Sequence, residues 1–217
     1  FCYMPFENAP DITPPPVSAN GYVTFGSFNN LSKLTPDVIV LWAELLQNIP
    51  NSRLILKWHT LADEIIREKL FAAFEKHGVR REQLELRTAS SHLEMLREYT
   101  DIDIALDPFP FSGGITSCEA LWMGVPVITL PGSRPVSRQT FSFLALLEMG
   151  KFAAQSKEEY ITIAQKLAED PPQLAALRAD LRTRMARSPL CDAPQFARNL
   201  EAAFHKIWSM RAPAEHA

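Results

Sequence analysis

Apolar and polar residues alternate along this chain with two different periods. Short runs that are almost continuously apolar predict buried strands, and longer segments with an apolar residue every three or four positions predict helices that bury one face. The predicted strands are Tyr22–Ser27, Arg53–Lys57, Leu84–Arg87, Ile102–Leu106 and Val125–Leu130. The predicted helices span residues 36–48, 61–76, 92–100, 115–123, 137–148 and 157–168, before a largely helical tail.

Several helix ends carry capping signals. Thr35 before Pro36 supplies an N-cap followed by proline at the first helical position. Ser91 and Glu94 form a capping-box pattern, in which each side chain satisfies one backbone N–H at the start of a helix. Gly124 is placed to end the helix over residues 115–123.

Strands that alternate with helices of this length predict an α/β fold, a Rossmann-like parallel sheet with helices on both faces and five or six strands. In such sheets ligands bind beyond the carboxyl ends of the strands, so chemistry is expected in the loops at that rim. These loops are Ser27–Lys33, Lys57–Thr60, Thr88–His92, Asp107–Thr116 and Pro131–Arg138.

The chain divides into three parts by composition. Residues 1–20 are rich in proline and predict an extended linker from an upstream region, so that the ordered domain begins near Gly21. Residues 21–186 form the predicted domain, and 187–217 a helical tail that is expected to pack back toward a missing upstream lobe. Its apolar residues at helical spacing predict a core or docking stripe; they are Phe196, Leu200, Phe204, Ile207 and Trp208. Because the first residue is phenylalanine and no secretory signal follows, the chain is expected to come from the middle of a longer protein.

Composition narrows the function classes. With 22 Lys and Arg against 25 Asp and Glu among 217 residues, the net charge of −3 provides no general attraction for nucleic acid. No apolar run is long enough for a membrane span. Cys2, Cys118 and Cys191 are odd in number and widely spaced, which fits neither a disulfide framework nor a metal cluster and favours a reducing cytoplasm.

The loop from Asp107 to Ser117 contains the most informative motif. Gly113 and Gly114 let the backbone approach a phosphate, and the N–H groups of the helix that follows lie at the positive end of its dipole. Thr116 adds a hydroxyl donor. The alternative is that the two glycines only form a turn and that a hydroxyl caps the helix.

Two charged residues extend this motif. Glu119, one turn into the same helix, is placed to accept hydrogen bonds from a ribose, although a first-turn carboxylate also stabilises a helix dipole. Lys33, at the end of the first rim loop, is placed to meet a diphosphate, and the alternative is an ordinary surface lysine.

Four segments together resemble the C-terminal catalytic lobe of the O-GlcNAc transferase family, which includes bacterial and SPINDLY-type members. The similarity extends from about Gly21 to Trp208. The segments are Phe25–Asn30 with Lys33, Asp103–Pro110, Thr116–Pro126 and Ser188–Leu190.

This resemblance implies the donor-binding lobe of a GT-B glycosyltransferase. It implies that Lys33 contacts the donor diphosphate and acts as a catalytic residue, with Asn30 beside it. It places Glu119 on the ribose and the backbone near Ser90 on the uracil. His92, at a helix start, is expected either to approach the phosphate or the base or to have no role in binding. The residues implied to hold phosphate are Gly113, Gly114, Ile115 and Thr116.

The implied reaction is inverting transfer of GlcNAc from UDP-GlcNAc to Ser or Thr of an acceptor protein. The nucleotide sugar is a substrate, and no cofactor or metal is expected. The acceptor would be recruited by tetratricopeptide repeats upstream, and an N-terminal catalytic lobe would complete the cleft, so the chain alone should be inactive. Two alternatives stay open: a SPINDLY-type fucosyltransferase that uses GDP-fucose, and a catalytically silent nucleotide-binding or interaction module.

Overall fold

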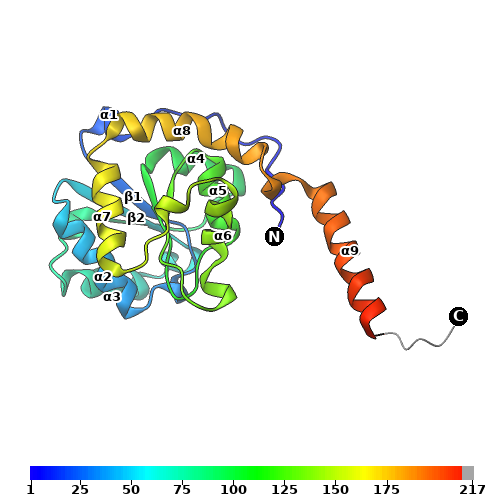
Figure 1. The fold of residues 1–217 in the computed structure, drawn as a ribbon. Helices are drawn as coiled ribbons and strands as arrows, with labels where there is room; N and C mark the ends of the chain where they lie inside the picture. The colour runs from blue at the N-terminus through cyan, green and yellow to red at the C-terminus, as the bar shows by residue number, and fades with distance from the viewer. Residues whose placement is uncertain (212–217) are drawn as a thin grey trace, which may run out of the picture.

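A five-stranded parallel sheet forms the centre of the protein. The computed structural model describes residues 1–211 (Figure 1). The strand order is β3-β2-β1-β4-β5. The predicted parallel α/β sheet is therefore confirmed. The strands are β1 Val23–Ser27, β2 Ser52–Lys57, β3 Leu84–Arg87, β4 Ile104–Leu106 and β5 Val127–Ile128.

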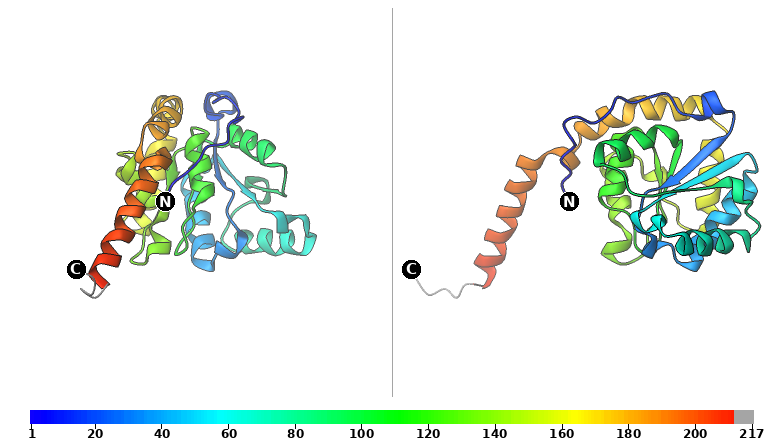
Figure 2. Two further views of the ribbon diagram at one scale, coloured as in Figure 1. Left: turned by 90° about the vertical axis from the view of Figure 1, so that its right-hand side faces the viewer. Right: turned by 180° about the vertical axis from the view of Figure 1, so that it is seen from behind.

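Helices surround the sheet (Figures 1 and 2). Helix α2 packs against α3 and α7, whereas α5 packs against α6 and α8. The apolar face predicted for residues 36–48 is buried, including Trp42 at the centre of the core. The helices are α1 Val17–Asn20, α2 Pro36–Asn48, α3 Glu64–Glu75, α4 His92–Glu98, α5 Ile115–Trp122, α6 Gln139–Leu146, α7 Lys157–Ala168, α8 Pro171–Ala186 and α9 Ala193–Arg211.

Several element boundaries differ from the prediction by one to three residues, and two of these differences have an identifiable cause. The helix expected over residues 61–76 begins only at Glu64, because the Asp63 side chain accepts hydrogen bonds from the backbone N–H groups of Ile65 and Ile66 and caps it there. The last strand is shorter than Val125–Leu130. Its extension is a single parallel bridge from Thr129 to residue 153, a partner that strand propensity cannot reveal.

The segment 1–20 packs on the domain, which differs from the expectation that order begins near Gly21. Arg178 of α8 is 2 % exposed, and its guanidinium donates to the carbonyl oxygens of Thr13 (2.6 Å), Ile102 (2.7 Å) and Tyr99 (3.0 Å). Asp103 accepts a hydrogen bond from the Val17 N–H at 3.0 Å. Residues 1–16 form neither helix nor strand, as their prolines predict, but buried charged side chains of the domain pair with backbone groups of Thr13 and Val17.

Helix α9 extends away from the rest of the chain (Figures 1 and 2). Its apolar residues, which the sequence suggested as a core or docking stripe, lie exposed and form no part of the core of the described residues; they are Phe196, Leu200, Phe204, Ile207 and Trp208. Among residues 1–211, no helix has the length and apolarity needed to cross a bilayer.

Candidate functional site

The buried carboxamide of Asn29 joins the two central rim loops. Its Oδ1 accepts hydrogen bonds from the Lys33 ammonium (3.2 Å) and from the Thr116 hydroxyl (3.0 Å). Lys33 follows β1 and Thr116 lies in the first turn of α5, so residues 83 positions apart in sequence flank one oxygen atom. The structure thus brings together Lys33 and Thr116 as the resemblance implies.

Lys33 is held over the glycine loop. Its Nζ also donates to the Ser112 carbonyl at 3.0 Å and lies 4.4 Å from the centre of the Phe111 ring. Partial burial lowers the pKa of Lys33 from its usual value, while the negative charge of nearby Asp107 acts in the opposite direction. A partly dehydrated cation with a fixed position interacts more strongly with an incoming anion than a fully solvated one does.

Asp107 supports the glycine loop from below. It is 1 % exposed, and its carboxylate accepts hydrogen bonds from Gly113 N–H (2.5 Å) and the Thr129 hydroxyl (2.6 Å). A Cβ atom at Gly113 would collide with the Ser117 hydroxyl, so this position requires glycine for space. Asp107 therefore fixes the path of the backbone into α5.

The N-terminus of α5 is open to an anion. Gly114 occupies the N-cap position, where no side chain accepts from the helix. The first N–H groups of a helix have no intrahelical acceptor and carry partial positive charge. Thr116, in this first turn, and Lys33 both donate to Asn29 Oδ1. The free N–H groups of α5 and the Lys33 ammonium therefore lie at the same end of the glycine loop.

Burial raises the pKa of Asp107 to about 6, although Lys33 and the hydrogen bonds act to lower it. An acid whose folded-state pKa is raised favours folding below its unfolded pKa of about 3.9, and this contribution is lost as pH rises through the folded pKa. We therefore expect the free energy of unfolding of wild type minus that of Asp107→Asn to be more positive near pH 4 than near pH 7. Urea unfolding of both proteins at the two pH values measures this difference. A difference that is constant across this range would contradict the assignment.

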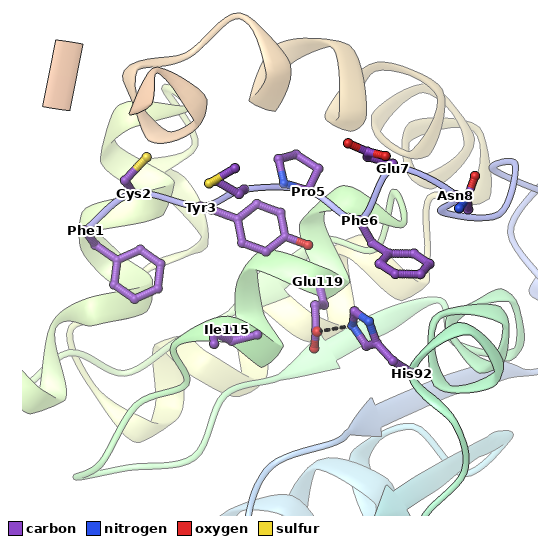
Figure 3. Close-up of a pocket in the computed structure, with 11 residues that line it drawn as sticks. Phe1, Cys2, Tyr3, Pro5, Phe6, Glu7, Asn8, His92, Ile115 and Glu119 are labelled. Atoms are coloured by element: carbon purple, nitrogen blue, oxygen red, sulfur yellow. Dashed lines mark hydrogen bonds and ion pairs between the residues drawn. The ribbon is translucent and has the colours of Figure 1, made fainter. Parts of the chain in front are cut away.

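Glu119 and His92 form an ion-pair geometry beside a large cavity. His92 Nε2 lies 2.8 Å from Glu119 Oε1, and Glu119 is 4 % exposed (Figure 3). Burial raises the pKa of Glu119, and the hydrogen bond with His92 opposes that shift. The cavity, about 700 Å³, is bounded by Glu119, His92, Ile115 and residues 1–8. Its volume is within the range of small-molecule sites, about 300 to 1,000 Å³.

A smaller cavity is lined in part by Thr116. It measures about 170 Å³ and is lined by Phe28, Trp58, Met95 and the chain at Ser90, among others. This volume suits only part of a ligand, because sites for whole drug-sized molecules measure about 300 Å³ or more. Its aromatic and thioether walls suit a flat ring.

Ser90 and Lys57 are fixed near this smaller cavity by Glu98. The Glu98 carboxylate accepts from the Ser90 hydroxyl (2.8 Å) and from the Lys57 ammonium (2.7 Å), and Lys57 is 6 % exposed. The Ser90 side chain is thereby occupied. The contact of its backbone with uracil, which the resemblance implies, stays a prediction.

The two neighbouring asparagines of the first rim loop have different contacts. The Asn30 side chain accepts from Ser32 N–H (3.0 Å) and caps a 3-10 turn at Leu31–Lys33, while the preceding Asn29 holds Lys33. Sequence reasoning missed Asn29 and the supporting role of Asp107. Asp107 directly follows β4 and Asn29 lies two residues beyond β1, and a polar residue just after a buried strand was the signal available for them. The role of Asn30 as a donor ligand stays a prediction.

No cluster of three or more His, Cys, Asp or Glu side chains with metal-binding geometry occurs in the part of the chain that the structure describes. All three cysteines are free.

The fold is that of a glycosyltransferase lobe. Over 94 % of this chain and 38 % of the other, the structure superposes on a lysine-to-methionine mutant of the Thermobaculum terrenum O-GlcNAc transferase, with a TM-score of 0.88 and 39 % identity. The model of glycosyl transferase family 41 matches residues 18–200. The chain belongs to this family, and its sheet is the GT-B lobe that O-GlcNAc transferases contain.

Plant relatives support this assignment. A probable UDP-N-acetylglucosamine–peptide N-acetylglucosaminyltransferase SPINDLY from Petunia hybrida is 39 % identical over 95 % of this chain, and the protein named SEC from Arabidopsis thaliana is 32 % identical over 88 %. The chain spans only 22 % and 19 % of the length of these two relatives. The relatives are named as glycosyltransferases.

Proposed function

We propose that the chain is the donor-binding lobe of an inverting protein O-glycosyltransferase that transfers GlcNAc from UDP-GlcNAc to Ser or Thr. The observation that carries this proposal is the meeting of Lys33 with the uncapped N-terminus of α5, whose first residues also line a small aromatic cavity and the cavity at Glu119. The diphosphate would lie at Lys33 and the base in the small aromatic cavity, with the ribose, which joins them, reaching Glu119.

In this proposal the lobe acts on the leaving group. When the sugar–phosphate bond breaks, negative charge develops on the diphosphate, and Lys33 with the N–H groups of Ile115 and Thr116 stabilises it. Such preorganised donors contribute most to catalysis where charge develops in the transition state. The sugar itself would face the N-terminal catalytic lobe, which would provide the acceptor side and the general base.

The remaining partners are proposed on the same basis. The acceptor protein would be recruited by tetratricopeptide repeats of the upstream region, in the cytoplasm. The exposed apolar stripe of α9 supports the proposal that this helix packs back toward the N-terminal lobe, since soluble proteins seldom leave such stripes uncovered.

GDP-fucose is the second candidate donor. The relatives named SPINDLY are 38 to 40 % identical to this chain, compared with 32 % for the one named SEC. The two donors differ in their base. The uracil base of UDP is a single ring that suits the cavity of about 170 Å³, whereas the two-ring guanine base of GDP requires more space.

Calorimetric titration of UDP and GDP into the chain tests the proposal. We expect UDP to bind at least about tenfold more tightly, which corresponds to about 1.4 kcal/mol. Tighter binding of GDP would favour the fucosyltransferase, and binding of neither would contradict both. We also expect the chain alone to give no transfer from UDP-GlcNAc to peptides. Turnover by this lobe alone would contradict that part, and a full-length protein that binds UDP without transfer would indicate a silent module.

A further inference from the structure

The N-terminal segment forms one wall of the cavity at Glu119. Residues 1–8 run along the side of the cavity opposite Ile115 and Glu119, and they bring the rings of Tyr3 and Phe6 to it (Figure 3). The Phe6 ring meets His92 edge-on, with 5.0 Å between ring centres. A segment that its composition marks as a linker thus contributes side chains to the candidate site.

Two polar atoms of the buried residues that line this cavity have no hydrogen-bond partner among the described residues. Within residues 1–211, no hydrogen bond reaches the Tyr3 hydroxyl or the Oε2 atom of Glu119, whereas Oε1 is paired with His92. The polar side-chain atoms that are fully sealed without a partner in this part of the chain are the indole nitrogens of Trp42 and Trp122. The Tyr3 hydroxyl and Glu119 Oε2 are therefore not sealed, and both residues line the cavity.

Tyr3 is held in a defined position. Its side chain is 7 % exposed, its backbone N–H donates to the Leu190 carbonyl at 2.8 Å, and its ring lies edge-on to Trp122 at 6.4 Å. Figure 3 shows the hydroxyl on the Glu119 side of the ring. Burial, followed by the negative charge of Glu119, raises the pKa of Tyr3, so the hydroxyl remains a donor at neutral pH.

We propose that Tyr3 and Glu119 together bind the ribose diol of the nucleotide donor. The Tyr3 hydroxyl donates to one ribose hydroxyl, and the neighbouring ribose hydroxyl donates to Glu119 Oε2. His92 holds the other carboxylate oxygen and so orients the acceptor. Tyr3 is thereby assigned as a further donor-binding residue. This inference rests on the proposed function, since it requires a nucleotide at the rim.

A comparison of two ligands in two proteins tests the assignment. UDP and 2′,3′-dideoxy-UDP are titrated calorimetrically into wild type and Tyr3→Phe, a change that removes the hydroxyl and retains the packed ring. A neutral hydrogen bond contributes about 0.5 to 1.5 kcal/mol, so we expect Tyr3→Phe to weaken UDP binding about two- to tenfold. The dideoxy ligand lacks the diol, and its affinity should be the same for both proteins.

Tyr22→Phe is the matched control, because Tyr22 precedes β1 at the opposite end of the sheet and packs with Arg53. It should leave both affinities unchanged. Unchanged UDP affinity in Tyr3→Phe, or an equal loss for both ligands, would overturn the assignment. If wild type binds UDP through Lys33 and the Tyr3 comparison shows no diol-dependent loss, only this inference fails. If wild type binds no UDP, the proposed function fails with it.

Discussion

Lys33→Ala is expected to weaken UDP binding about tenfold to a hundredfold and to leave uridine binding unchanged. A charge-assisted hydrogen bond is worth about 1.5 to 3 kcal/mol, which corresponds to that range of affinity. The Lys33 ammonium is fixed by Asn29 and Ser112 before any ligand arrives, so little of this energy is spent on ordering it. Calorimetric titration of both ligands measures the effect.

The control for this experiment is Lys69→Ala, which removes an exposed lysine of α3 away from the rim. Its affinities should match those of wild type. Thermal unfolding of Lys33→Ala should show a fold that remains intact. If UDP affinity does not change, or if uridine loses as much as UDP, Lys33 is not the diphosphate ligand.

Arg178→Met is expected to lower the free energy of unfolding by about 3 to 5 kcal/mol, because each buried acceptor left without a partner costs about 1 to 3 kcal/mol. The substitution removes the donors of three carbonyl oxygens, those of Thr13, Tyr99 and Ile102. Burial lowers the pKa of the Arg178 guanidinium to about 10, which leaves it charged at neutral pH. Urea unfolding of the variant and wild type measures the loss.

Arg187→Met, an exposed position at the end of α8, is the control and should change stability by no more than about 0.5 kcal/mol. Hydrogen exchange gives a second readout. The amide of Val17, which donates to Asp103, should exchange faster in Arg178→Met because the N-terminal segment is released. A loss of stability below about 1 kcal/mol, with unchanged exchange, would show that Arg178 does not anchor the segment.

The two experiments probe different levels of the same site. In the proposed function Lys33 contacts the ligand directly, whereas Arg178 acts on the segment that brings Tyr3 to the cavity. We therefore expect Arg178→Met also to weaken UDP binding, although by less than Lys33→Ala, since Lys33 and Thr116 keep their shared contact at Asn29.

Patterns in the sequence were enough to predict the sheet, its helices and the loops that contain the candidate site. Local signals were sufficient for this, since apolar periodicity and caps such as Thr35 and Ser91 depend on neighbours within a few residues. The parallel order then placed Lys33 and Thr116 at one rim, because loops that follow parallel strands share an edge.

The pairing of the buried polar groups, by contrast, depends on the tertiary packing of the elements. Asn29 rather than Asn30 accepts a hydrogen bond from Lys33, and Glu98 accepts hydrogen bonds from Lys57 and Ser90. Residues 1–20 pack on the domain through contacts such as that of Arg178 with Thr13. Most of these contacts join residues that are distant in sequence, as Thr13 and Arg178 are. Burial requires that polar groups be paired, but no local sequence pattern shows which partner each group has. Periodicity records which face of an element is buried, but the partner of a buried polar atom is fixed only when the elements pack together.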